Sequence, residues 1–111
     1  MGQYKIKVLQ IAQDDMKSII TYIRMEDPEA AIRMVEKIKA AIGNLADFPL
    51  MGTIPRDKKI AAQGYRMIVV EPYLVFYILV TDDNTVEIHR VLHGSVIIQI
   101  FSGEKPGSSH P

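Results

Sequence analysis

Three side chains that can exchange protons or hold phosphate lie close together in the stretch VEIHRVLHGS: His89, Arg90 and His93. An imidazole gains and loses a proton near neutral pH, and a guanidinium can grip a phosphate through two hydrogen bonds. The stretch is typical of a strand, in which successive side chains point to opposite faces. His89, Val91 and His93 are therefore predicted on one face and Arg90 on the other, so they can form one site only if a β-bulge intervenes.

A second group of cations lies upstream. Residues 51–70 carry Arg56, Lys58, Lys59 and Arg66 against the single acid Asp57, and this excess predicts a local basic patch. Arg56, Lys58 and Lys59 are candidates for binding, although lysines in a loop are commonly just solvated. Arg66 and Arg90 can instead pair with Glu71 or Glu87 across a sheet.

Carboxylates do not form a predicted metal site. Asp14 and Asp15 stand at an expected helix start, and Asp82 and Asp83 stand in an expected turn, where capping and turn chemistry explain them. The chain has no cysteine, which excludes disulfides, thiol nucleophiles and thiolate metal ligands. No metal and no cofactor are predicted.

Composition limits the class of protein. The 111 residues have room for one domain, and 48% hydrophobic with 23% charged residues is ordinary globular composition. A formal net charge of zero excludes the strong positive field of proteins that grip nucleic acid by its phosphates. No apolar run approaches the roughly 18 residues that span a bilayer, and the amino terminus lacks a signal-peptide pattern. We therefore expect a cytoplasmic protein that does not bind membranes.

The elements that must position these residues follow from periodicity. Alternation predicts a strand at residues 4–11, and helical spacing of apolar residues predicts helices from Asp14 and from Pro28 to about Phe48. An irregular loop should cover 51–64, followed by strands at 65–70, 73–80 and 85–93. The order β-α-α-β-β-β predicts an α+β fold with a helical hairpin packed on one face of a mainly antiparallel sheet.

One domain is expected over residues 1–102, and the Gly, Ser and Pro content of 103–111 predicts a disordered tail. Apolar positions on the inward faces are predicted to be mostly buried: Met16, Ile20, Ile23, Val35, Ile38, Ile42, Val75, Tyr77 and Ile88.

Three segments together resemble a known family. FPLMGTIP closes the second helix, GYRMIVVEPYLVFYILV follows the loop, and VEIHRVLHG ends the sheet, an order that resembles the RelE/ParE superfamily of type II toxin–antitoxin toxins, the plasmid stabilisation family. The resemblance implies a small cytoplasmic toxin that a cognate antitoxin neutralises. RelE-like members cleave mRNA in the ribosome, whereas ParE-like members inhibit DNA gyrase by binding.

The target is predicted from a departure from the family pattern. After the histidine and glycine, members commonly carry an arginine and then an aspartate–tyrosine pair, but this chain reads Ser95, Val96, Ile97, Ile98. Together with the zero net charge, the missing arginine favours a ParE-like gyrase inhibitor. The alternatives are a RelE-like ribonuclease, with Arg66, Arg90 and His93 as its catalytic residues, and a degenerate toxin retained as a corepressor.

The apolar run Val96–Phe101 needs a cover, because an exposed apolar edge invites aggregation. Either a second copy of the chain in a homodimer or the antitoxin can supply it, and Ile98 is the predicted binding residue in this run.

Overall fold

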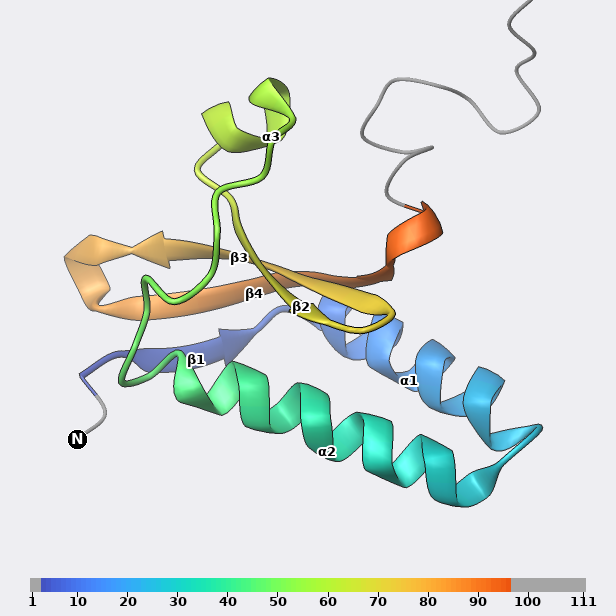
Figure 1. Ribbon diagram of the computed structural model, residues 1–111. Coiled ribbons are helices and arrows are strands. Elements are labelled where there is room, and N and C mark those ends of the chain that lie inside the picture. The colour runs from blue at the N-terminus through green and yellow to red at the C-terminus, as the bar shows by residue number, and fades with distance from the viewer. Residues whose placement is uncertain (1–2, 97–111) are drawn as a thin grey trace, which may run out of the picture.

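The computed structural model describes residues 3–96, which form a four-stranded sheet with the strand order β1-β4-β3-β2 (Figure 1). Strands β2 (Arg66–Val70), β3 (Tyr73–Val80) and β4 (Thr85–His93) form an antiparallel meander, as predicted. Strand β1 (Lys5–Val8) joins the far side of β4 in parallel. The α+β class and the element order β-α-α-β-β-β are confirmed, with two short helices added: one before β2 and a single 3-10 turn, Thr81–Asp83, between β3 and β4.

Helices α1 (Gln10–Arg24) and α2 (Pro28–Asn44) form the predicted hairpin and lie together under one face of the sheet (Figure 1). The start of α2 is explained by its sequence: the Asp27 carboxylate accepts hydrogen bonds from the backbone N–H groups of Glu29 and Ala30, each at 3.1 Å. Pro28 occupies the first turn, where its missing N–H costs nothing.

The predicted start of α1 at Asp14 is wrong, because the helix begins at Gln10. Leu9 explains the difference. Its N–H still donates to the carbonyl of Ile88 in β4, while its own carbonyl already accepts from the N–H of Gln13. Strand β1 therefore passes into α1 without an intervening loop, and Asp15 lies inside the helix.

The core lies between the hairpin and the sheet. Its buried members are Ala12, Ile19, Ile38, Ile42, Leu45, Tyr73, Val75, Tyr77, Val86, Ile88 and Val91. Of the positions predicted to be mostly buried, Ile38, Ile42, Val75, Tyr77 and Ile88 are buried, and Met16, Ile20, Ile23 and Val35 are partly buried. We call the sheet face that the hairpin covers the inner face, and the opposite one the outer face.

The segment predicted as an uninterrupted loop contains a third helix, α3 (Lys58–Ala62). The Asp57 carboxylate caps it by accepting hydrogen bonds from the N–H groups of Lys59 and Ile60. Ile60 is buried, and the loop is tied to the edge of the sheet where Thr53 pairs with Met67. The capping aspartate was the sequence signal for this helix.

Candidate functional residues on the two faces of the sheet

A β-bulge changes which side chains share a face of β4. Ile88 pairs with Tyr77 and Arg90 pairs with the adjacent Phe76, so His89 is an extra residue in β4. Ile88 and Val91 both belong to the core, which leaves His89 and Arg90 together on the outer face. The strict alternation predicted for this strand is therefore wrong. The β-bulge that would allow His89 and Arg90 to share a face is present.

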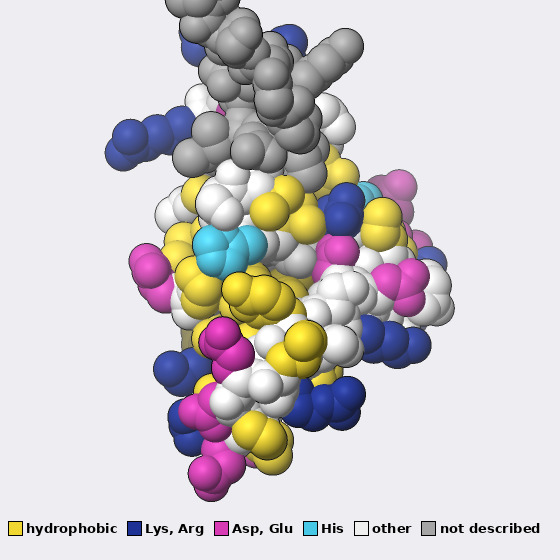
Figure 2. Space-filling view, turned by 90° about the vertical axis from the view of Figure 1, so that its right-hand side faces the viewer, with side chains coloured by type: hydrophobic (Ala, Val, Ile, Leu, Met, Phe, Trp, Pro, Cys, Tyr) yellow, Lys and Arg dark blue, Asp and Glu magenta, His cyan; other side chains and the backbone are white. Residues whose placement is uncertain are grey.

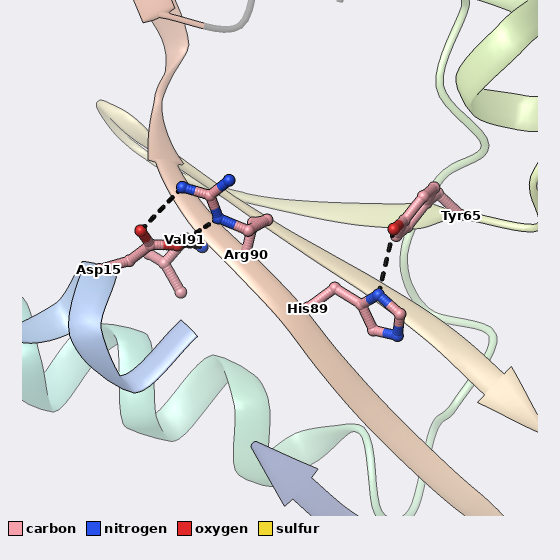
Figure 3. A network of polar contacts seen from close by, with 5 residues as sticks. All are labelled: Asp15, Tyr65, His89, Arg90 and Val91. Carbon is pink, nitrogen blue, oxygen red and sulfur yellow. Dashed lines mark hydrogen bonds and ion pairs between the residues drawn. The ribbon is translucent and has the colours of Figure 1, made fainter. Parts of the chain in front are cut away.

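Arg90 is bound to helix α1. Its Nε and Nη2 donate to the two carboxylate oxygens of Asp15 at 2.8 and 3.0 Å, and the N–H of Val91 donates to the same carboxylate at 2.9 Å (Figure 3). The carboxylate is well shielded, with 13% of the side chain exposed, while Arg90 is 32% exposed. These hydrogen bonds raise the pKa of Arg90 above its ordinary value, against the opposing effect of burial.

Two predictions about these side chains are corrected. Arg90 pairs with Asp15 rather than with Glu71 or Glu87, and Asp15 anchors a helix to a strand rather than capping a helix. The physical reason is the shortness of β1, which pairs with β4 only as far as Ile88. Beyond that point the N–H of Val91 has no strand partner on that side, and the Asp15 carboxylate satisfies it.

His89 belongs to a chain of hydrogen bonds on the outer face. Its Nδ1 lies 3.1 Å from the hydroxyl of Tyr65, and its Nε2 lies 3.1 Å from a carboxylate oxygen of Glu87 (Figure 3 shows the first contact). The Tyr65 ring also meets His89 and Phe76 edge-on. In a neutral imidazole this arrangement fits a proton on Nε2, donated to Glu87, and a lone pair on Nδ1 that accepts from Tyr65. The predicted candidates did not include Tyr65 or Glu87.

Arg66 is on the inner face, because it pairs with Tyr77. Its Nη1 donates to the carbonyl of Gly52 at 2.8 Å and lies 3.5 Å from that of Leu50. The Tyr77 hydroxyl accepts from the N–H of Gly52 at 2.9 Å and donates to the carbonyl of Pro49 at 2.8 Å. Burial raises the pKa of Tyr77, so this hydroxyl is protonated at neutral pH and can donate.

His93 lies at the end of β4, where its Nδ1 accepts the N–H of Ser95 at 3.1 Å and contacts the Ser95 hydroxyl at 2.8 Å. It also lines a cleft of about 660 Å³ between the helical hairpin and the end of the sheet, with Tyr22, Met34 and Tyr73 among the other lining residues. In Figure 2, hydrophobic side chains gather around a histidine on this side of the molecule.

The sheet thus keeps the predicted catalytic residues apart. Arg66 lies on the inner face, Arg90 on the outer face, and His93 at the strand end, and each is held by a contact within the chain. Of the predicted binding residues, Arg56, Lys58 and Lys59 are exposed, and Ile98 lies outside the described residues. Within residues 3–96, no cluster of three or more histidine, aspartate or glutamate side chains is placed to hold a metal ion. Nor is any helix of that part of the chain long and apolar enough to cross a membrane.

Two solved toxin–antitoxin structures have the same fold. The chromosomal ParDE toxin–antitoxin system from P. aeruginosa matches with a TM-score of 0.68 at 17% identity, covering 84% of this chain and 98% of the other. The toxin–antitoxin complex RelBE2 from Mycobacterium tuberculosis matches with a TM-score of 0.58 at 24% identity, covering 82% and 98%. At these low sequence identities, the structural similarity establishes the fold and nothing further.

Sequence comparison gives the family. This chain is 31% identical to "Putative toxin Y4kP" of Sinorhizobium fredii over 93 residues, covering 84% of this chain and 91% of the relative. It is 32% identical to Toxin RelE2 of Caulobacter vibrioides over 81 residues, covering 73% and 84%. A family model described as the ParE toxin of the type II toxin–antitoxin system parDE matches residues 6–98. The chain therefore belongs to the ParE toxin family, within the ParE/RelE superfamily of type II toxin–antitoxin toxins.

Proposed function

We propose that this toxin inhibits DNA gyrase by binding it, and that a cognate protein antitoxin neutralises the toxin. The observation that carries the proposal is the internal use of Arg66, Arg90 and His93, each at a different place in the sheet. A ribonuclease needs a base, an acid and a cation around one phosphate. Groups on opposite faces of a sheet cannot surround the same phosphate.

The contacts of Arg90 and Arg66 also make these two side chains poorly available to RNA. Arg90 shares its charge with a shielded carboxylate through two hydrogen bonds, so little positive potential is left for a substrate phosphate. Turning Arg66 toward RNA would break its hydrogen bond to Gly52 and release the loop that it holds. Inhibition by binding requires no such rearrangement.

The antitoxin partner is supported by the two structural relatives, which are named as toxin–antitoxin systems or complexes. The cleft beside His93 offers an apolar surface on the side of the hairpin, where a partner segment can bury hydrophobic side chains. The homodimer predicted from Val96–Phe101 rests on residues of which most lie outside the described range.

The direct test is a supercoiling assay with purified gyrase, relaxed plasmid and the toxin, run beside a translation extract. We expect supercoiling to fall as the toxin concentration rises and mRNA on ribosomes to remain intact. Unimpaired supercoiling with codon-specific mRNA cuts would reject the proposal.

A specific observation favours the ribonuclease as the second candidate. The bulge brings His89 and Arg90 to one face, and His89 is hydrogen-bonded between Tyr65 and Glu87, an arrangement able to exchange protons. Under this alternative, Tyr65→Phe, which removes only the hydroxyl, should abolish mRNA cuts while the protein stays folded. Cuts that persist in this variant would exclude Tyr65 from the chemistry.

A further inference from the structure

Exposed apolar side chains are concentrated in the loop between α2 and α3. Phe48, Leu50, Met51 and Ile54 are 63%, 63%, 45% and 60% exposed, and we call these four residues the loop patch. Hydrophobic residues scattered singly over a surface are common, but four within seven positions are not. Val69, on the neighbouring edge strand β2, is 52% exposed as well.

This loop is held in place although it is irregular. Tyr77 fixes Pro49 and Gly52, and Arg66 fixes the carbonyl of Gly52, so two side chains of the sheet hold the backbone beneath the loop patch. Gly52 is required for the close approach, because a Cβ there would lie 2.5 Å from the Tyr77 hydroxyl and 2.8 Å from the carbonyl of Met67.

A fixed and exposed apolar loop is suited to binding. Exposing such side chains to water costs free energy, and a flexible loop would turn some of them inward. Because the loop backbone is already ordered, binding of a partner at the loop patch costs little further conformational entropy of the loop. The hydrogen bonds from Tyr77 and Arg66 thus keep the apolar side chains exposed, which favours affinity for a partner and lowers the solubility of the free toxin.

Charge around the loop patch indicates the chemistry of the partner. Arg56, Lys58 and Lys59 follow directly in the sequence, are exposed, and make no ion pair within residues 3–96. The carboxylate between them, Asp57, is occupied in capping α3. An apolar segment that continues along the chain into a basic one complements a protein surface on which an apolar pocket lies next to carboxylates. A nucleic acid fits less well, since Phe48 is the single aromatic ring among the four residues of the loop patch.

We propose that the loop patch, together with Arg56, Lys58 and Lys59 that follow it in the chain, is the surface by which the toxin holds its cellular target. The inference rests on the proposed function only in that the toxin acts by binding a protein. It assigns the target contact to the α2–α3 loop and the edge of β2, away from the cleft beside His93.

The test compares Leu50→Glu with Ile32→Glu. Both wild-type side chains are exposed to the same degree, 63% and 61%, but Ile32 lies on α2, outside the loop patch. Toxicity is measured by the induction level that stops growth, and inhibition is measured with purified gyrase. Leu50→Glu removes an apolar contact and places a negative charge opposite the carboxylates of the target, so the potency of this variant should fall at least about 10-fold. Ile32→Glu should change potency by less than about 2-fold.

A second pair of variants tests the basic residues. Lys58→Glu with Lys59→Glu should lower potency and reduce its dependence on salt, whereas Lys37→Glu with Lys39→Glu, on exposed positions of α2, should do neither. Thermal unfolding checks that each variant is folded. All the substituted side chains are exposed, so no loss of packing is expected.

The outcomes separate the two proposals. If Leu50→Glu loses toxicity but wild-type toxin does not slow gyrase, the target is another protein and the loop patch stands. If gyrase is inhibited equally by wild type and Leu50→Glu, the function stands and the loop patch is rejected. It is also rejected if Leu50→Glu stays toxic but escapes neutralisation by the protein encoded beside the toxin, or if Ile32→Glu loses as much potency.

Discussion

Asp15 joins two elements that are far apart in the sequence. Its carboxylate accepts two hydrogen bonds from Arg90 and one from the N–H of Val91, so a single side chain of α1 closes the edge of β4 that β1 leaves open. Removing one partner of a shielded ion pair costs more than the pair contributes, because the other charge and the strand N–H remain unpaired.

Asp15→Ala should therefore lower the free energy of unfolding by about 2–3 kcal/mol, a range discounted because Arg90 is partly exposed. Asp14→Ala is the matched control, since Asp14 is exposed and only accepts a hydrogen bond from Gln10, and it should change stability by less than about 0.5 kcal/mol. Urea denaturation measures both. Equal effects of the two substitutions would mean that the Asp15 contacts do not stabilise the fold.

Tyr77 makes the fold sensitive to alkaline pH. Burial raises the folded-state pKa of its phenol above the ordinary value of 10.0, so the folded protein holds the phenolic proton more tightly than the unfolded chain. The resulting stabilisation is fully present below about pH 10 and is lost as pH rises through the higher folded-state pKa. Tyr73 acts in the same direction, because burial raises its pKa too.

Tyr77→Phe should lower stability at neutral pH by about 1–2 kcal/mol, through the lost hydrogen bonds to Pro49 and Gly52, and should lessen the decline above pH 10. Tyr22→Phe, at a 71% exposed position, is the control; it removes only the smaller effect of Tyr22 on the pKa of Tyr73 and should keep most of the wild-type decline. Unfolding free energies from pH 7 to 11 measure both effects. If the unfolding free energy of Tyr77→Phe falls above pH 10 as steeply as that of the wild type, the Tyr77 phenol is not the source of the decline.

At the scale of elements, periodicity predicted the meander, the hairpin and the start of α2, because each has its signal within a few neighbouring residues. The bulge at His89 could not be predicted, since an extra residue in β4 is defined only against its partner β3. The pairing of Asp15 with Arg90 depends on where β1 ends, which the sequence of β1 alone does not reveal. The candidate residues were thus identified by type, but their faces and partners were not.

The loop between α2 and α3 provides an element-scale prediction. Gly52→Ala should destabilise the protein by about 1–3 kcal/mol, because the added methyl group meets the Tyr77 hydroxyl and the carbonyl of Met67. Gly43→Ala is the matched substitution in α2, with nothing within 4 Å of the new Cβ, and should stabilise by about 0.5–1 kcal/mol. Thermal melts compare the two. A neutral Gly52→Ala would contradict the close packing of this loop.

At the scale of the whole molecule, two surfaces lie at different places around one core. The cleft beside His93 lies between the hairpin and the end of the sheet, and the loop patch lies between α2 and α3. A neutral net charge with a basic segment confined to Arg56–Lys59 suits recognition of a protein better than recognition of a nucleic acid backbone. These features support the proposal that the toxin acts by binding a protein.

The superhelical density of a reporter plasmid, measured in cells shortly after the toxin is induced, tests this account most directly. Gyrase introduces the negative supercoils that other topoisomerases remove, so its inhibition leaves their removal unopposed. We predict that the plasmid relaxes before growth stops. Growth arrest with an unchanged superhelical density would contradict the account.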